Sequence, residues 1–372
     1  MQPPSLPEHI AALKPYLPGM PISELSRRVG IPAEAIVKLA SNENPLGASP
    51  KALAALARTP IDLSRYPDND CAAGCEAIAA FHDVPADWVV LGAGSESLLG
   101  ILASALLAPG RSSVYSQYSF QAYVNAVQKV GARSVVVASP HLKVDLQALA
   151  TAATSPTELV YVANPGNPTG TSVDPDELDA FIAGVASHTV VLLDEAYFEF
   201  MPAGLRGDSI ARVRRHPNLV LTRTFSKAYG LAGLRIGYAI AQSGLADLMR
   251  RVRSPFTISE PAQVAAVAAL DDAEFIRRTV ETTNASREIL VAELEALGMP
   301  TIESHTNFVL ADVKGGAGFA KAMEGHGFIV RPVASYGLPQ WVRIGLGTPE
   351  EMRRFVDVVR GLWVGEHRSA GG

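Results

Sequence analysis

The sequence has few of the features that mark membrane, secreted or nucleic-acid-binding proteins. It holds only two cysteines, Cys71 and Cys75, too few for the disulfide framework of a small secreted protein or for a four-cysteine metal site. No apolar run approaches the roughly 18 residues of a membrane-spanning helix, and the N-terminus lacks the basic and apolar start of a secretory signal. The net charge is −5, without a long block of Lys or Arg, so nucleic acid is not an expected partner. We expect a soluble, cytoplasmic protein with no metal site, whose two thiols are buried or half-buried rather than paired in a disulfide.

What is present is an ordinary globular composition. Hydrophobic residues make up 48% of the 372 residues and charged residues 19%, which leaves enough apolar side chains for a substantial core. This length predicts one large domain of about 250 residues and a smaller one, with a cleft between them. We expect an N-terminal arm over residues 1–40, a large domain over 41–265, and a small C-terminal α+β domain over 266–372 that packs with the arm.

Short β-branched runs alternate with Ala- and Leu-rich helical patterns in the large domain, which predicts a mainly parallel α/β sheet. The expected strands, apolar on both faces, lie at 88–92, 134–139, 158–164, 189–195, 219–225 and 236–241. The segment SNENPLG at 41–47 is interpreted as a turn. In the C-terminal part, helical patterns at 272–297, 316–326 and 348–364 enclose the strand-like pieces NFVLADV and WVRIGLG.

Lys227 follows a predicted strand in the segment TRTFSKAYGLAGLRIGY. A lysine at such a place is usually a solvated surface residue. One that forms a Schiff base must instead lose its proton at working pH, which needs a desolvated site or a neighbouring cation. Ser226 and Arg235 supply a hydroxyl and a guanidinium that suit a phosphate dianion.

Asp194 ends the most apolar predicted strand, at the edge of an α/β sheet where ligands collect. A buried carboxylate needs a cationic partner, and a protonated pyridine nitrogen is one that would also act as an electron sink. Tyr197, together with Asn167 in the turn NPGNPTG, could bind the phenolic oxygen of the same ring. Taken alone, Asp194 could instead cap the next helix, and NPGNPTG could be an ordinary turn.

The segment GAGSES at 92–97 follows a strand and precedes a helical pattern. Its backbone N–H groups would therefore lie at a helix N-terminus, where anions bind. This signal is weak alone, because the segment does not complete the dinucleotide pattern G-x-G-x-x-G.

These motifs follow one another on successive strand ends, and with KPYLPG near residue 14 and VRIGLGT near residue 348 they span nearly the whole chain. The sequence resembles the fold-type I pyridoxal-phosphate enzymes of the class I and II aminotransferases, most closely the histidinol-phosphate aminotransferase family. The resemblance implies a pyridoxal 5′-phosphate cofactor. It also implies ping-pong transamination from L-histidinol phosphate to 2-oxoglutarate, which yields imidazole acetol phosphate and L-glutamate in histidine biosynthesis.

The resemblance also implies a role for individual residues at the cofactor. Lys227 would be the Schiff-base lysine and would carry a proton between the substrate Cα and the cofactor. Tyr66, in RYPD at 65–68, would reach the cofactor phosphate of a neighbouring subunit, which implies an obligate homodimer. The remaining cofactor contacts would be Gly94, Ser95, Ser226 and Arg235 at the phosphate, Asp194 at the pyridinium, Tyr197 and Asn167 at the phenolic oxygen, and Phe120 stacked on the ring.

Arg343 lies on a predicted strand among apolar residues, where an arginine needs an anion to meet. By resemblance, Arg343 and Arg331 bind the anionic end of the substrate together with Tyr16 of the KPY element, and Asn307 lies nearby. For each arginine, a surface salt bridge is the alternative.

Two departures from the family concern the substrate pocket. Ser97 stands where relatives often carry an acidic residue, and Thr257 stands where many carry Asn. The nearest alternative is an aromatic-amino-acid aminotransferase on the same scaffold, because the resemblance extends to family members that accept phenylalanine or tyrosine. More distant alternatives are a decarboxylase of a phosphorylated amino acid and a cofactor-binding regulator that has lost catalysis.

Overall fold

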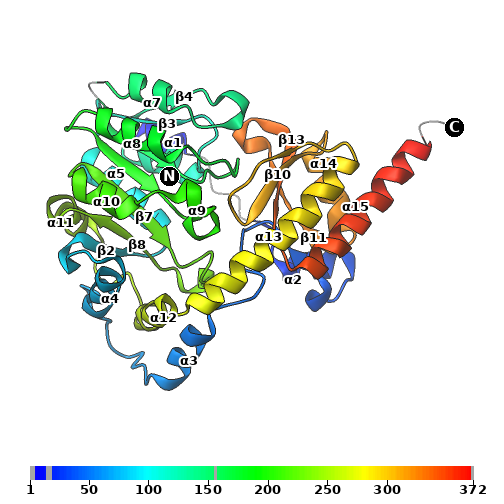
Figure 1. Cartoon of the computed structure of the whole chain (residues 1–372), viewed down its shortest axis with the longest axis horizontal. Helices are drawn as coiled ribbons and strands as arrows, with labels where there is room; N and C mark the ends of the chain where they lie inside the picture. The colour runs from blue at the N-terminus through cyan, green and yellow to red at the C-terminus, as the bar shows by residue number, and fades with distance from the viewer. Residues whose placement is uncertain (1–4, 14–18, 155–156, 370–372) are drawn as a thin grey trace.

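The computed structural model describes residues 5–13, 19–154 and 157–369, which form two lobes (Figure 1). The larger lobe contains a seven-stranded sheet and the smaller a four-stranded sheet. The long helix α13 (Ala273–Ala296) runs from one lobe to the other. Within the described ranges, no helix is both long enough and apolar enough to cross a membrane.

The large sheet is mainly parallel, as the sequence predicts. Only β8 runs antiparallel to its neighbours. In their order across the sheet, the strands are β2 (Val89–Gly92), β8 (Gly237–Ala241), β7 (Leu219–Thr224), β6 (Val190–Asp194), β5 (Thr157–Ala163), β3 (Ser112–Ser116) and β4 (Arg133–Val137). All six predicted strands are present, and β3 is an additional strand that the sequence did not reveal.

The central strands β6 and β7 are buried along their whole length because helices cover both faces of the sheet. In β6, Val190 and Leu192 face one set of helices, whereas Val191 and Leu193 face the other. We call the first side the α5 face, which is covered by α5 (Ser95–Leu106), α6 (Gln121–Lys129) and α11 (Ser243–Val252). The second is the α12 face, which is covered by α3 (Pro50–Arg58), α4 (Ala72–His82), α7 (Leu146–Ala152), α8 (Pro175–Gly184), α10 (Ser209–Arg215) and α12 (Glu260–Leu270).

The expectation that every strand is buried on both faces is wrong for β4. It lies at the edge of the sheet, and Val136 is exposed there. The edge position alone does not cause this exposure, because β2 at the opposite edge is buried at every residue; the elements around β4 leave most of its side chains partly in solvent. Cys71 and Cys75 are both buried and free, which confirms the expectation for the two thiols.

The smaller lobe carries its own core. Its sheet has the order β12 (Arg331–Val333), β13 (Leu338–Gly345), β10 (Phe308–Asp312) and β9 (Thr301–Ile302), all antiparallel. The predicted strand-like pieces thus form β10 and β13. Helices α13, α14 (Gly316–Glu324) and α15 (Pro349–Ser369) enclose the core, and α13 and α15 lie alongside each other (Figure 1).

Residues before 40 join different parts of the molecule. Helix α1 (Glu8–Ala11) lies on the large lobe, while α2 (Ile22–Val29) lies beside the small one (Figure 1). Strand β1 (Val37–Lys38) pairs in parallel with β11 (Phe328–Ile329). The expected domain boundary at residue 265 falls inside α12, so the division into three parts stays a prediction.

Candidate active site

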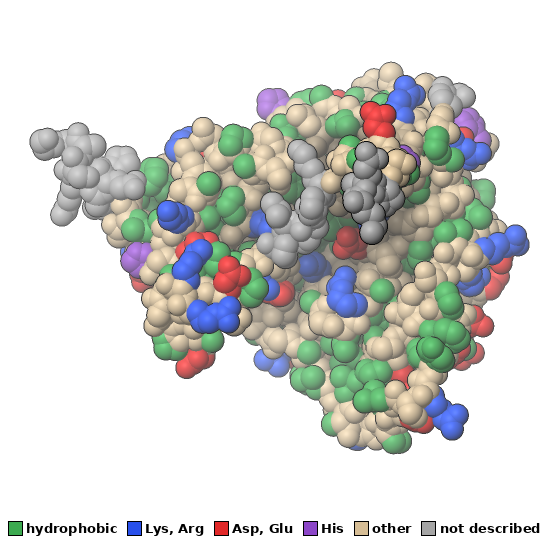
Figure 2. All heavy atoms as spheres, turned by 180° about the vertical axis from the view of Figure 1, so that it is seen from behind, with side chains coloured by type: hydrophobic (Ala, Val, Ile, Leu, Met, Phe, Trp, Pro, Cys, Tyr) green, Lys and Arg blue, Asp and Glu red, His purple; other side chains and the backbone are tan. Residues whose placement is uncertain are grey.

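A cavity of about 320 Å³ lies at the carboxyl ends of the parallel strands and is bordered by residues of both lobes. Seen from behind, the molecule is hollowed between the two lobes (Figure 2). Nine of the residues singled out in the sequence line this cavity, namely Ser95, Phe120, Asn167, Asp194, Tyr197, Ser226, Lys227, Arg235 and Arg343. The fold therefore brings together most of the predicted site from segments far apart in the sequence.

Lys227 presents its amine to the cavity from the loop after β7. Its Nζ donates to the backbone carbonyl of Ser41 at 3.1 Å. Burial, followed by the positive charge of Arg343, lowers the pKa of Lys227 to about 8. Both conditions that a reactive lysine needs are therefore present, a desolvated site and a neighbouring cation.

Asp194 lies at the end of β6 on the α5 face, with its carboxylate in the wall of the cavity. Tyr123 Oη donates to Oδ2 at 2.8 Å, and Thr222 Oγ1 donates to Oδ1 at 3.2 Å. Burial raises the pKa of Asp194 to about 6 even though these donors favour the charged form. Among the described residues Asp194 forms no ion pair, so a cation in the cavity would stabilise its charge.

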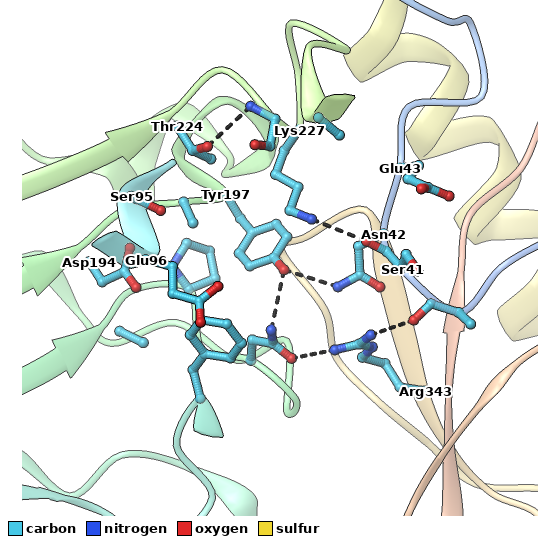
Figure 3. A pocket seen from close by; sticks show the side chains of 18 of the residues that line it. Ser41, Asn42, Glu43, Ser95, Glu96, Asp194, Tyr197, Thr224, Lys227 and Arg343 are labelled. Carbon is cyan, nitrogen blue, oxygen red and sulfur yellow. Dashed lines mark hydrogen bonds between the residues drawn. The ribbon is translucent and has the colours of Figure 1, made fainter. Parts of the chain in front are cut away.

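Four side chains form a hydrogen-bonded chain across the cavity (Figure 3). Arg343 Nη1 donates to Asn167 Oδ1 at 2.7 Å, and Asn167 Nδ2 donates to Tyr197 Oη at 3.4 Å. Asn42 Nδ2 donates to the same phenolic oxygen at 2.9 Å. Burial raises the pKa of Tyr197 to about 12, so Tyr197 keeps its proton at neutral pH and can donate it to a ligand.

Several groups that could bind an anion lie at the N-terminus of α5. Gly94 caps the helix, so its neighbours' backbone N–H groups point out of the first turn. Arg235 Nη1 lies 3.4 Å from Ser226 Oγ. Gly94 has φ +78°, and a Cβ at this position would lie 2.6 Å from Arg235 Nη2. Only glycine lets the guanidinium approach this closely, so that hydroxyl, guanidinium and helix N-terminus converge on one small volume.

Residues 40–44, which we call the strap, border the site. The sequence pattern at 41–47, which overlaps the strap, indicated only a turn. Ala40 O accepts from Arg343 Nη2 at 2.7 Å, Ser41 O accepts from Lys227, and Asn42 donates to Tyr197. Asn44 Nδ2 then donates to Ala228 O at 2.9 Å. Successive residues of the strap thus contact different parts of the site.

Four predicted residues within the described ranges do not line the cavity, and one of them, Gly94, caps α5 beside it. Tyr66 is 82% exposed and stacks on Phe256 with ring centroids 4.7 Å apart. Asn307 is buried and donates to the strap carbonyl of Asn42 at 2.9 Å. Arg331 lies directly opposite Arg343 in the ladder of β12 and β13, so both side chains leave the same face of that sheet. Tyr16 lies outside the described residues.

The two departures from the family pattern border a different cavity. Ser97 and Thr257 line a neighbouring space of about 320 Å³, and Glu96 borders both this space and the cavity of Lys227. A change at Ser97 or Thr257 therefore acts on the Lys227 cavity only through its neighbours.

Two residues that donate hydrogen bonds to Asp194, Tyr123 and Thr222, were not predicted from the sequence. Tyr123 lies within YSFQAY, three residues after Phe120, the only residue of this segment that was singled out, and belongs to α6. Thr222 stands opposite Asp194 in the register of β6 and β7. Thr222 could have been predicted from its position in the strand, because residues paired across parallel strands point to the same face of the sheet.

A second buried carboxylate lies on the α12 face, one residue after Asp194. Glu195 Oε2 accepts from Arg223 Nε at 3.0 Å and from Arg223 Nη2 at 2.8 Å, and Ser209 donates to the other oxygen. The Arg223 guanidinium lies 3.6 Å from the centre of the Phe198 ring. Burial disfavours the charge of Arg223, but the carboxylate of Glu195 outweighs burial and raises the pKa of Arg223.

Comparison with known proteins places the chain among enzymes of one type. The family model for aminotransferase class I and II matches residues 34–359. The chain is 47% identical over 354 residues to histidinol-phosphate aminotransferase 1 of Cupriavidus pinatubonensis, covering 94% of each protein. It is 49% identical over 349 residues to histidinol-phosphate aminotransferase 2 of Ralstonia nicotianae, covering 93% of each. Among solved structures, it is similar to the histidinol-phosphate aminotransferase of Sinorhizobium meliloti in complex with pyridoxal 5′-phosphate, with a TM-score of 0.86, 29% identity, and 96% and 98% of the two chains covered.

Proposed function

Because the chain belongs to the class I and II aminotransferase family, we propose that it transfers the amino group of L-histidinol phosphate to 2-oxoglutarate with pyridoxal 5′-phosphate as cofactor. The products are imidazole acetol phosphate and L-glutamate. The observation that carries this proposal is the shared cavity of Lys227, Asp194 and the anion site at α5. The substrate is the one named for relatives that are 47% and 49% identical. The cytoplasmic location expected from the sequence is part of this proposal.

The residues of the cavity fit this cofactor at three separate points. The anion site of Gly94, Ser95, Ser226 and Arg235 suits its phosphate. Asp194, which is buried and forms no ion pair among the described residues, suits a pyridinium nitrogen. When bound, the cofactor supplies an aldehyde carbon for an amine and a cationic ring that withdraws electrons. Phe120 borders the same space with a flat apolar surface for that ring.

Lys227 would hold the cofactor covalently and then move a proton. With a pKa of about 8, an appreciable fraction of its amine is neutral near neutral pH. With its amine free, Lys227 Nζ would accept the proton from the substrate Cα as a general base. Asp194 keeps the ring nitrogen protonated through this step, because its carboxylate is more stable beside a positive charge.

Arg343 would bind the anionic end of both substrates. It lies in the cavity wall, and Asn167 and the Ala40 carbonyl hold its guanidinium. The proposal includes Arg331, which lies opposite Arg343 in the ladder, and Tyr16 of the KPY element. Asn307 would contribute indirectly, since it holds the strap beside these groups.

We also propose that the chain acts as a homodimer in which Tyr66 reaches the cofactor phosphate of the partner. Tyr66 is 82%, Leu63 86% and Leu53 54% exposed, and large apolar side chains left in solvent often mark an interface. Figure 2 shows hydrophobic side chains gathered in the lower half of the molecule. Light scattering should give the mass of two chains, and Tyr66→Ala should weaken cofactor binding without changing that mass.

The substrate is tested by two half-reactions of the cofactor-loaded enzyme. The enzyme is mixed with L-histidinol phosphate or with L-phenylalanine, and loss of the visible absorption band of the cofactor is followed in each case. We expect histidinol phosphate to react faster. A rate with phenylalanine about tenfold higher, which corresponds to about 1.4 kcal/mol of transition-state preference, would establish the aromatic aminotransferase instead.

The covalent role of Lys227 is tested by Lys227→Ala, with Lys314→Ala as a surface lysine control. Lys227→Ala should abolish turnover and should release the cofactor on denaturation after borohydride treatment. Lys314→Ala should retain both turnover and the covalent link. Cofactor that stays attached to Lys227→Ala would show that another amine forms the link.

A further inference from the structure

The phenolic oxygen of Tyr197 meets two amide groups in the cavity (Figure 3). Asn42 Nδ2 lies 2.9 Å and Asn167 Nδ2 3.4 Å from Tyr197 Oη. Both groups are N–H donors, so the phenolic oxygen accepts from both. A tyrosine has a single O–H proton of its own to donate. With both amide neighbours donating, this proton points toward the cavity.

The orientation of the Asn167 amide is set by a third residue. Arg343 Nη1 donates to Asn167 Oδ1 at 2.7 Å, and a guanidinium can only donate. The Oδ1 of Asn167 must therefore face Arg343, which leaves Nδ2 to face Tyr197. Asn167 is thus fixed as a donor.

Asn42 has the same donor role but a different environment. It is 2% exposed, with φ +54°, and its backbone carbonyl accepts from Asn307. Its Oδ1 is buried and has no hydrogen-bond partner among the described residues. An unpaired carbonyl oxygen is tolerated more readily in an interior than an unpaired N–H. This asymmetry favours the orientation in which Nδ2 faces Tyr197.

We propose that Asn42 is a positioning residue for the transamination. By donating to Tyr197, Asn42 prevents the tyrosine from donating to the strap and keeps its O–H proton directed at the cavity. There the proton is donated to the anionic phenolic oxygen of the bound cofactor. The inference rests on the proposed function, because this oxygen belongs to pyridoxal phosphate. Asn42 acts only through Tyr197.

The test compares two substitutions that separate the donor from the shape of Asn42. Asn42→Asp keeps the shape but replaces the N–H donor with an acceptor, so Tyr197 would turn its proton toward the introduced carboxylate and away from the cofactor. Asn42→Gly removes the side chain without strain, because φ +54° suits glycine, and leaves the tyrosine proton free. The dissociation constant of pyridoxal phosphate is measured with the cofactor-free protein, and urea unfolding checks the fold of each variant.

We expect Asn42→Asp to weaken cofactor binding about tenfold or more, as for a lost hydrogen bond to a charged group, and Asn42→Gly to weaken it less than about threefold. In a Tyr197→Phe background the difference between the two should shrink to less than about threefold. A residual weakening by Asn42→Asp of less than about threefold in this background is direct repulsion of the cofactor by the new charge.

Three outcomes would overturn the proposal. If Asn42→Asp binds the cofactor as tightly as the wild type, Asn42 already accepts the tyrosine proton. If Asn42→Gly weakens binding as much as Asn42→Asp, Asn42 only fills space. If the difference persists in Tyr197→Phe, it does not act through Tyr197. Failure of the proposed function is distinct, since the wild type would then form no covalent link to pyridoxal phosphate through Lys227.

Discussion

Asp194 and Glu195 are neighbours in sequence, both are buried, and they lie on opposite faces of the large sheet. Glu195 on the α12 face is paired with Arg223 and hydrogen-bonded to Ser209. Asp194 on the α5 face has two hydroxyl donors and, within the described part of the chain, no cation. The charge of Glu195 therefore has a cationic partner, whereas the charge of Asp194 is stabilised, among the described residues, by hydrogen bonds alone.

The difference separates a structural carboxylate from a functional one. A buried charge without a cationic partner costs free energy in the folded protein. Nothing in burial or in sequence position distinguishes the two residues; only their partners do. Asp194 would gain its missing partner when a cationic ring binds in the cavity, so the cost in the free protein becomes binding energy for the ligand.

The largest effect is expected at Asp194, the functional carboxylate. Asp194→Asn keeps the shape of the side chain but removes its charge, so the ring nitrogen loses the group that keeps it protonated. We expect turnover to fall about a thousandfold, on the scale of losing one preorganised electrostatic contact, while the fold is retained. Steady-state kinetics and urea unfolding measure the two effects. Near-normal turnover would contradict the pairing of Asp194 with the cofactor.

The second-largest effect is expected at Glu195, the structural carboxylate. Glu195→Gln removes the carboxylate that is hydrogen-bonded to the buried guanidinium of Arg223 and leaves only the charge of Glu199 to favour it. This loss should lower the free energy of unfolding by about 3–5 kcal/mol. Turnover per folded molecule should change little. As a control, Glu195→Leu combined with Arg223→Leu removes both charges and should be more stable than Glu195→Gln alone. If the double variant is less stable than Glu195→Gln, the ion pair contributes net stability.

Asp194 should also make the free energy of unfolding depend on pH. Because burial raises the pKa of Asp194 to about 6, above its ordinary value of about 4, the folded cofactor-free protein binds this proton more tightly than the unfolded chain. Stability from this group is therefore full below pH 4 and is lost as the pH rises to about 6, by roughly 2–3 kcal/mol. Asp194→Asn should lack this loss. Urea unfolding of both proteins between pH 4 and 7 measures it, and parallel curves would refute it.

The smallest effect concerns the hydroxyl donors that partly compensate for the missing cation. Thr222→Val removes the bond to Asp194 Oδ1 and should cost about 1 kcal/mol, or about fivefold in kcat/KM. Thr283→Val is a matched control, because Thr283 Oγ1 is buried without a hydrogen-bond partner in the described structure. Equal effects of the two substitutions would show that Thr222 does not act through Asp194.

The strands could be predicted where their residues are β-branched and apolar. Strand β3 was missed because three of its five residues are serines, Ser112, Ser113 and Ser116, although all five are buried. Ser112 Oγ lies 3.4 Å from Thr157 Oγ1 of β5, whereas Ser113 Oγ is buried without a hydrogen-bond partner in the described structure. Burial of these serines depends on packing that the sequence does not show. The exposed edge at β4 was missed for a related reason, since position in the sheet is a property of the topology.

The site could be predicted in its strand-end motifs but not in the strap. Lys227, Asp194 and Asn167 carry distinctive side chains at strand ends. Ala40 and Ser41, in contrast, contact Arg343 and Lys227 through their backbone carbonyls. Every residue type has this carbonyl, so no pattern of side chains could reveal the contact. Asn42 does have an informative side chain, but its partner Tyr197 lies 155 positions away.

The strap also sets a limit on when the site can form during synthesis. Ala40 leaves the ribosome early, whereas Arg343 follows it by 303 positions and Lys227 follows Ser41 by 186. The large sheet can form once β8 has emerged, because domains fold as units during translation. The contact between the strap and Arg343 can form only after synthesis of β13, the last strand of the described chain. A nascent chain that ends before β13 should therefore be largely folded in its larger lobe and yet unable to hold the anionic end of a substrate.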